Sequence, residues 1–155
     1  MELRGQYIEC HIIRRNGETW EFLLLRRAEG EIYPGIWQMV TGGIEAGEVA
    51  FKAALREMKE ETGLVPEKFY TLPLISSFYT PHLDTINFLP VFLAIAGSEQ
   101  SVRISGEHSE FVWVSGEKAK ELMIWEGQKK GVDYILNNFV NNFREEATLN
   151  LEIVL

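Results

Sequence analysis

Residues 42–64, with the sequence GGIEAGEVAFKAALREMKEETGL, constrain the fold more than any other segment of the chain. Within residues 49–62, apolar side chains recur at the i, i+3, i+4 and i+7 positions of one helical face. Gly63 stands where a helix-ending glycine belongs, because glycine adopts the left-handed conformation without steric cost. The segment therefore predicts a glycine-containing loop followed by an amphipathic helix with one side packed against a core.

The polar side of this predicted helix carries three carboxylates. At 100° per residue, Glu57, Glu60 and Glu61 share an arc of roughly 100°. Like charges at this spacing repel one another by about 0.2–0.5 kcal/mol per pair, and a divalent cation would turn that repulsion into attraction. Ligands that are all oxygen favour Mg²⁺, Mn²⁺ or Ca²⁺ over zinc or copper. The other interpretation is an ordinary solvated helix face.

Strand patterns surround the helix on both sides. The dipeptide Asn16-Gly17 is typical of a tight hairpin in which both central residues have positive φ, so we expect it to join the first two strands. The expected strands are residues 6–14, 19–27, 37–41, 69–79, 85–96, 110–114 and 149–155, with a loop over 28–36 and one or two helices within 116–143. This mixed order of strands and helices predicts the α/β class, an α/β sandwich with a mixed sheet.

Length, charge and cysteine content narrow the class of protein. The chain has 155 residues, so we expect residues 1–155 to form a single domain. The net charge of −8 argues against nucleic acid as a partner. A single cysteine, Cys10, excludes an intrachain disulfide, and we expect it to be a buried structural thiol. No apolar run approaches the ~18 residues of a membrane helix, and no signal peptide is recognisable, so we expect a cytoplasmic protein with no membrane partner.

The segment 42–64 resembles the signature of the Nudix hydrolase family. That signature is a glycine, five residues, a glutamate, seven residues, and then Arg-Glu-apolar-any-Glu-Glu-any-Gly-apolar. The matching positions are Gly42, Glu48, Arg56, Glu57, Met58, Glu60, Glu61, Gly63 and Leu64, with no departure. The resemblance implies the family's α/β/α sandwich. It also implies cleavage of a diphosphate linkage in a nucleoside triphosphate, with Mg²⁺, or Mn²⁺ as the alternative ion.

The resemblance assigns roles to the motif residues. It implies that Gly42 and the three helix glutamates, Glu57, Glu60 and Glu61, form the metal site. Glu60 or Glu61 would take the proton from the attacking water. Arg56 is the motif residue best placed to hold Glu57 by a charge-assisted hydrogen bond.

Three further stretches are similar to the branch of that family containing bacterial dATP pyrophosphohydrolase, also known as dihydroneopterin triphosphate pyrophosphatase. They are the pair Arg26-Arg27, WQMVTGGIEAGE and SGEHSEFVWVS. This second resemblance implies that Glu107 is a metal ligand from outside the helix and that Arg27 and Thr41 contact the substrate. Consecutive strand residues point to opposite faces, so Arg26 would then be a solvated surface charge.

Several alternatives stay open at this point. The substrate could be another nucleoside diphosphate derivative, such as ADP-ribose, a dinucleoside polyphosphate or a nucleotide sugar. The chain could also be a non-catalytic nucleotide-binding regulator, and either a monomer or a homodimer. His108 could neighbour the metal ligands or lie at the surface. The aromatic residues that could stack on a base, or simply pack, are Tyr33, Trp37, Tyr79 and Trp125.

Overall fold

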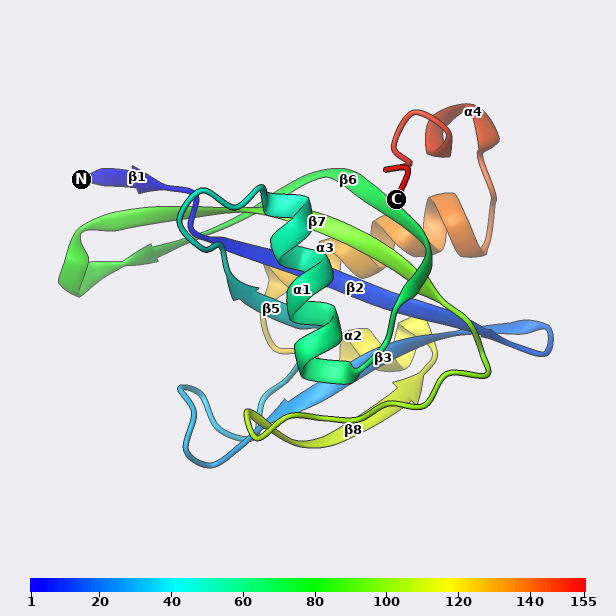
Figure 1. Cartoon of the computed structure of the whole chain (residues 1–155), viewed down its shortest axis with the longest axis horizontal. Helices are drawn as coiled ribbons and strands as arrows, with labels where there is room; N and C mark the ends of the chain where they lie inside the picture. Colours follow the sequence, from blue (N-terminus) through cyan, green and yellow to red (C-terminus); the bar gives the residue numbers. More distant parts are fainter.

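A mixed eight-stranded sheet runs through the molecule, with helices on both of its faces (Figure 1). The computed structural model describes residues 1–155. In chain order the elements are β1 (Glu2–Arg4), β2 (Tyr7–Asn16), β3 (Thr19–Arg27), β4 (Trp37–Gln38), β5 (Val40–Gly43), α1 (Ala50–Thr62), β6 (Pro66–Thr80), a 3₁₀ turn (Pro81–Leu83), β7 (Thr85–Ala96), β8 (His108–Val114), α2 (Gly116–Leu122), α3 (Glu126–Ile135), a π-helical turn (Leu136–Val140) and α4 (Glu145–Thr148).

The sheet combines parallel and antiparallel pairs, as the mixed order of elements predicts. β2 pairs parallel with β7 and antiparallel with β3 and β5. β1 is parallel to β7, and β6 forms a long antiparallel hairpin with β7. β4 and β8 both pair antiparallel with β3. The expected α/β sandwich with a mixed sheet is therefore confirmed.

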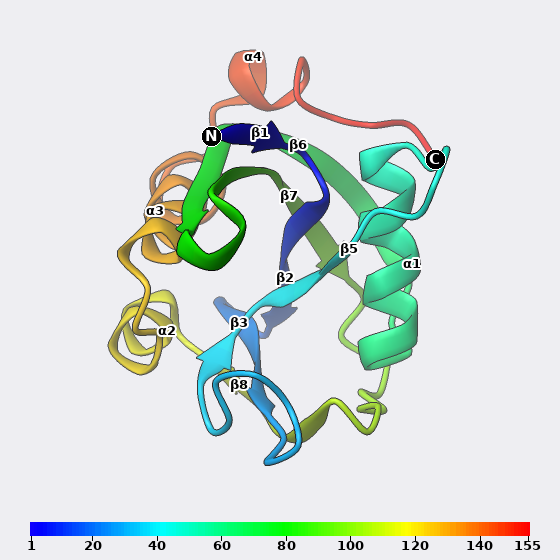
Figure 2. The same cartoon turned by 90° about the vertical axis from the view of Figure 1, so that its left-hand side faces the viewer.

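Two hydrophobic cores lie on opposite faces of the sheet. Alternation in β2 sends Ile8, Cys10 and Ile12 to the face covered by α1, where Met58 packs against them. Ile13 faces the other way, into a core that includes residues of α2 and α3. Figure 2 shows α1 on one side of the sheet and α2 and α3 on the other. The result is a three-layer α/β/α arrangement.

The first hairpin turn lies one residue later than expected. Asn16 is the last residue of β2 and pairs with Thr19, so the two turn residues are Gly17 and Glu18. Gly17 has φ of 62°, whereas Asn16 is in the strand and has no positive φ. The glycine alone supplies the left-handed conformation, so a turn with one positive φ replaces the expected turn with two.

The expected strand over residues 149–155 does not form. The tail makes a single bridge to β6, between Glu152 and Tyr70, after the short helix α4. Ile153 N donates to the Phe69 carbonyl at 2.8 Å, and Thr71 N donates to the Leu151 carbonyl at 3.0 Å. The next donor in this pattern would be residue 73, which is a proline and has no N–H, so the ladder stops there.

The expected single strand over residues 37–41 is instead two strands: β4 pairs with β3, whereas β5 pairs with β2 and includes both Gly42 and Gly43. The remaining expected elements are confirmed with small shifts of their ends. The helix begins at Ala50 and ends at Thr62, and Gly63 caps it with φ of 73°. The region 116–143 holds two α-helices and the π-helical turn. None of the helices is both long enough and apolar enough to span a membrane.

Candidate active site

Helix α1 is held against the sheet by its small and apolar side. Ala53, Ala54 and Met58 are fully buried in the core beneath it. The terminal hydrogen bond from Gly63 N to the Lys59 carbonyl, 2.8 Å long, fixes the last turn. This turn carries the glutamates at 60 and 61, so the same packing that anchors the helix also positions the carboxylates.

Arg56 joins the glycine loop to the helix. Its Nε and Nη2 donate to the two carboxylate oxygens of Glu48, both at 2.9 Å, and Nη2 also donates to the Gly43 carbonyl at 2.8 Å. Its Nη1 donates to Glu57 at 2.9 Å and to Glu60 at 3.3 Å. Bonding to Arg56 lowers the pKa of Glu48 to about 2. The expected bond between Arg56 and Glu57 is therefore present, as one of several from the same guanidinium.

Gly42 makes room for the carboxylate of Glu57. A Cβ added at residue 42 would lie 2.2 Å from Glu57 Cδ and 2.5 Å from its Oε1. No side chain fits there, so a glycine is required for β5 and α1 to come this close. The Glu57 side chain is largely covered as a result, which together with neighbouring charges raises its pKa despite the hydrogen bond from Arg56.

Glu61 is a buried carboxyl without a partner. Its side chain is only 3% exposed, and its Oε2 accepts no hydrogen bond. Burial raises the pKa of Glu61 to about 9, with further contributions from the charges of Glu57, Glu107 and Glu60. A buried polar atom without a partner costs free energy, so this oxygen fits a cation or a hydrogen-bond donor that completes the site.

Glu107, just before β8, and Arg27, the last residue of β3, both act on Glu61 through their charges. The Glu107 carbonyl accepts from Ala28 N at 2.9 Å, which fixes the loop before β8 to the end of β3. The exposed Glu107 carboxylate raises the pKa of both Glu57 and Glu61, whereas the charge of Arg27 lowers that of Glu61. Arg27 itself donates from Nε to the Ile32 carbonyl, so the loop over residues 28–36 occupies part of its guanidinium.

These carboxylates form an open cluster. No three carboxylate, imidazole or thiol side chains of the protein converge closely enough to hold one ion by themselves. The charges of Glu57, Glu60 and Glu107 act on Glu61, but these carboxylates do not converge into a ligand set in this structure. Mg²⁺ commonly binds in this way, with few carboxylates and the remainder of its ligands from water and phosphate.

Thr41 lies on the opposite face of the sheet from these carboxylates. It pairs with Glu9 of β2, whose neighbours Ile8 and Cys10 face α1, so Glu9 and Thr41 face the layer that contains α3. Thr41 Oγ1 accepts a hydrogen bond from Gln38 Nε2 at 3.3 Å. The structure therefore separates Thr41 from the metal-site candidates, although its chain neighbour at 42 touches Glu57.

Arg26 is exposed at the surface as expected, and there its guanidinium bonds to Glu110 at 3.2 Å and to the Gly35 carbonyl at 3.3 Å. The surface position considered for His108 is wrong: the side chain is buried, neither ring nitrogen has a partner, and burial lowers its pKa. Cys10 is buried as expected.

An aromatic pocket of about 340 Å³ lies on the α3 side of the sheet. Its lining residues are Tyr33, Gln38, Phe78, Tyr79, Trp125 and Gln128. Three of the four aromatic candidates from the sequence meet here, whereas Trp37 instead lies 6.0 Å from the guanidinium of Arg26. Sequence reasoning missed Phe78 and the two glutamines, although the adjacent aromatics at 78 and 79, just before the Pro81 turn, were a usable signal.

Comparison with known proteins gives a family match over most of the chain. A family model described as the NUDIX domain matches residues 8–135. The nucleoside triphosphatase NudI of Klebsiella pneumoniae is 27% identical over 126 residues, which are 76% of this chain and 87% of that protein. An octanoyltransferase of Myxococcus xanthus is 31% identical over 132 residues, which are 81% of this chain. The chain spans 35% of the length of that relative.

Solved structures share the fold. A NUDIX hydrolase from Listeria monocytogenes matches with a TM-score of 0.73 and 25% identity, over 98% of this chain and 100% of that one. The Escherichia coli dihydroneopterin triphosphate pyrophosphohydrolase matches with a TM-score of 0.69 and 24% identity, over 85% of this chain and 95% of that one. Both likenesses agree with the α/β/α arrangement described above.

Proposed function

The chain belongs to the Nudix family, whose domain model matches residues 8–135, and on this premise we propose that it hydrolyses a nucleoside triphosphate. The bond cleaved is a diphosphate linkage, and the products are a nucleoside monophosphate and pyrophosphate. The ion used is Mg²⁺, with Mn²⁺ as the alternative. Residues 1–155 act as a single domain, as a monomer or a homodimer, on a small-molecule substrate.

The observation that carries this function is the buried, unpartnered Oε2 of Glu61 beside other carboxylates. In the proposal, Glu57, Glu60, Glu61 and Glu107 would hold the ion, together with the carbonyl of Gly42. Their oxygen donors and their mutual repulsion both suit a divalent cation. When bound, such an ion neutralises charge on phosphate oxygens and makes a coordinated water a better nucleophile.

The chain's own residues would orient the substrate and move a proton. Arg56 holds the carboxylates of Glu57 and Glu60 through direct hydrogen bonds, so that they keep one position while the substrate binds. Glu60 or Glu61 accepts the proton from the attacking water. Arg27, whose charge already acts on Glu61, contacts the phosphate chain once the loop over residues 28–36 releases part of its guanidinium.

The nucleoside would lie on the other side of β5. Thr41 would contact it there, and the exposed rings of the aromatic pocket would stack on a planar base. The printed functions of two similar proteins, a nucleoside triphosphatase and a dihydroneopterin triphosphate pyrophosphohydrolase, support a triphosphate bearing a heterocycle.

A nucleotide panel tests the proposal directly. Purified protein is incubated with each nucleoside triphosphate, ADP-ribose, a dinucleoside polyphosphate and a nucleotide sugar, in Mg²⁺ or in EDTA, and the products are identified by mass. We expect a nucleoside monophosphate and pyrophosphate from at least one triphosphate, in Mg²⁺ only. Turnover of only the other substrates would replace the proposed substrate class, and tight nucleotide binding without turnover of any substrate would indicate a regulator.

A further inference from the structure

The side chains that line the aromatic pocket suit the binding of a flat ring. Tyr33, Phe78, Tyr79 and Trp125 come from three separate segments, and each ring is about half exposed. Tyr33 and Trp125 meet edge to face, with ring centroids 5.5 Å apart. Exposed aromatic rings that converge on one hollow are costly to leave in water, and their faces can stack on a heterocycle.

The backbone conformation of Tyr33 is a second observation that points to a binding site. Its φ of 54° lies in the left-handed region, where a non-glycine residue costs roughly 1–3 kcal/mol. The strained residue is the one that brings the loop over residues 28–36 against Trp125 at the pocket. Such strain persists where the surrounding structure holds it, and it is concentrated at ligand-binding positions.

The polar part of the pocket consists of two nearly buried glutamines. Gln38 is 6% exposed and Gln128 is 8% exposed. Gln38 uses its amide nitrogen inside the protein, as the donor to Thr41 Oγ1. The Gln128 side chain lies close enough to Glu9 to lower the pKa of that carboxyl, and its Oε1 is buried without any partner. Each amide nitrogen keeps one further N–H, and the Gln128 Oε1 is the acceptor that no group of the protein uses.

Glu9 fixes the orientation of the Gln128 amide. The Glu9 carboxylate is buried on β2 and accepts a hydrogen bond from Ser76 Oγ at 2.7 Å. Burial raises the pKa of Glu9, and the side chains of Ser76 and Gln128 lower it, as they do when both donate toward this carboxyl. The carbonyl oxygen of Gln128 is thereby directed away from Glu9.

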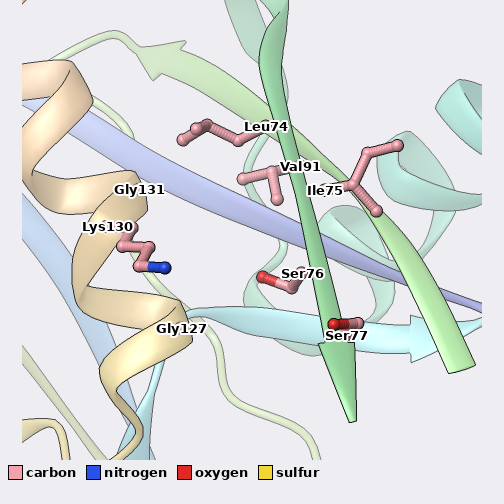
Figure 3. A pocket seen from close by; sticks show the side chains of 8 residues that line it. All are labelled: Leu74, Ile75, Ser76, Ser77, Val91, Gly127, Lys130 and Gly131. Atoms are coloured by element: carbon pink, nitrogen blue, oxygen red, sulfur yellow. The ribbon is translucent and has the colours of Figure 1, made fainter. Parts of the chain in front are cut away.

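The hollow on the other side of Ser76 does not suit a stacked ring. This smaller cavity, about 140 Å³, lies between β6 and α3 (Figure 3). Ser76 and Lys130 face it, and it has no aromatic lining residue. The aromatic pocket is thus the place where stacking surfaces and an unpartnered acceptor occur together.

We propose that the aromatic pocket binds a nucleobase or related heterocycle through its exocyclic amino group, with Gln128 as a specificity-determining residue and Glu9 as the residue that positions it. This deepens the proposed function and rests on it for the assumption that the ligand is a nucleotide. Adenine, guanine, cytosine and pterins carry such an amino group. Uracil and thymine have no exocyclic amino group, so their carbonyl oxygens cannot donate to the unpartnered Oε1 of Gln128.

Binding measured without metal separates this inference from catalysis. In EDTA, quenching of tryptophan fluorescence gives the Kd of nucleoside monophosphates in two matched pairs. The 5′-monophosphate of guanosine is compared with that of inosine, and the 5′-monophosphate of adenosine with that of purine riboside. Each pair differs by one amino group. We expect the amino-bearing member of at least one pair to bind at least about tenfold more tightly, because its partner leaves a buried acceptor unpaired.

Substitutions identify the residues responsible. Gln128→Met keeps the side-chain length but removes the acceptor, so the ratio of Kd values within the discriminating pair should fall to about twofold or less. Glu9→Gln should also reduce the ratio, because an amide can bond to Gln128 in either orientation. Gln100→Met is the matched control, since the Gln100 amide bonds only to the backbone of Val65 and should leave the ratio unchanged.

Each outcome decides the inference. Equal affinity within both pairs for the unaltered protein, no binding of any nucleotide, or an undiminished ratio in folded Gln128→Met would overturn it. If Gln128→Met does not fold, the ratios of Kd values measured for the unaltered protein and for Glu9→Gln still decide the inference. Amino-dependent binding without Mg²⁺-dependent turnover would support the inference and count against the proposed function. Mg²⁺-dependent turnover without a preference for the amino-bearing nucleotide would support the proposed function and overturn the inference.

Discussion

At the scale of single residues, Arg56 controls the geometry of the candidate site. Its planar guanidinium bonds at once to Glu48, to Glu57 and to the Gly43 carbonyl. A lysine keeps the charge but presents a single ammonium, which cannot bond in these directions together. The arginine therefore matters for its shape as much as for its charge.

Replacing this arginine by lysine should reduce activity far more than stability. We expect Arg56→Lys to lower kcat by about 10- to 100-fold, because Glu57 and Glu60 lose the group that orients them. Steady-state kinetics in Mg²⁺ and a thermal melt check both halves of this expectation. Arg15→Lys, at the distant hairpin turn, is the control, and an equal loss of kcat in both variants would contradict a special role for Arg56.

His11 provides a test of burial on the α3 side of the sheet. It lies directly beneath Gly131, where an added Cβ would be 2.1 Å from its Nε2, and burial lowers its pKa to about 4. In the unfolded chain a histidine takes up its proton near pH 6.5. Between about pH 6.5 and 4 the unfolded state therefore binds more protons, and the free energy of unfolding falls as the pH falls.

The size of this effect is at most about 1.4 kcal/mol per pH unit. Urea denaturation at several pH values should show a shallower loss of stability below pH 6.5 for His11→Gln than for the unaltered protein. His82→Gln removes an exposed histidine and should keep the original slope. Identical slopes for the unaltered protein and His11→Gln would show that His11 is protonated in the folded state.

At the scale of elements, the close approach of β5 to α1 depends on one of two adjacent glycines. An alanine at residue 42 would overlap the Glu57 carboxylate, whereas a Cβ at residue 43 would meet nothing nearer than 3.9 Å. Gly42→Ala should therefore cost about 1–3 kcal/mol of stability and most of the activity, while Gly43→Ala should retain both. Denaturation and kinetics of the two variants give the comparison, and equal effects would mean that the β5–α1 contact is differently arranged.

Two glutamates near the start of β8, Glu107 and Glu110, allow a similar comparison. Glu107 is close enough to affect Glu57 and Glu61, while Glu110 is paired with Arg26. We expect Glu107→Gln to lower kcat at saturating Mg²⁺ and substrate by at least about tenfold, and Glu110→Gln to leave it nearly unchanged. A loss confined to Glu110→Gln would transfer the ligand role to that residue.

The elements themselves were largely predictable, because local patterns determine them. The helix follows from apolar spacing and from Gly63, and the strands follow from runs of apolar residues bounded by turns. The errors have local causes that the patterns did not weigh: Gly17 alone supplies the positive φ of the hairpin, and Pro73 ends the pairing of the tail. Both errors concern which backbone groups pair, which apolar periodicity does not record.

The candidate site was predictable only where it is local. The clustering of Glu57, Glu60 and Glu61 follows from helical geometry, but the burial of Glu61 depends on the sheet beneath it. The face on which Thr41 lies depends on its register with β2. The aromatic pocket requires β6, the loop over 28–36 and the start of α3 to meet, which a single sequence does not specify.

At the scale of the whole molecule, the sheet separates two parts of one proposed site. Three of the carboxylates belong to α1, and Gln128 of α3 lines the aromatic pocket. Figure 2 shows α1 and α3 on opposite sides of the sheet. Consecutive residues of β5 connect them, since Gly42 touches Glu57 and Thr41 bonds to Gln38. We therefore expect a bound nucleotide to pass across β5, with its phosphates near α1 and its base near α3.

Hydrolysis by one pair of variants tests the central claim most directly. Glu61→Gln and Glu67→Gln are compared with the unaltered protein for Mg²⁺-dependent release of pyrophosphate from the best triphosphate of the panel. Glu67 lies beyond α1, so its variant should keep the original rate, whereas Glu61→Gln should lose on the order of 10²-fold in kcat. If both variants retained the full rate in Mg²⁺, the metal site would not be at the carboxylates of α1.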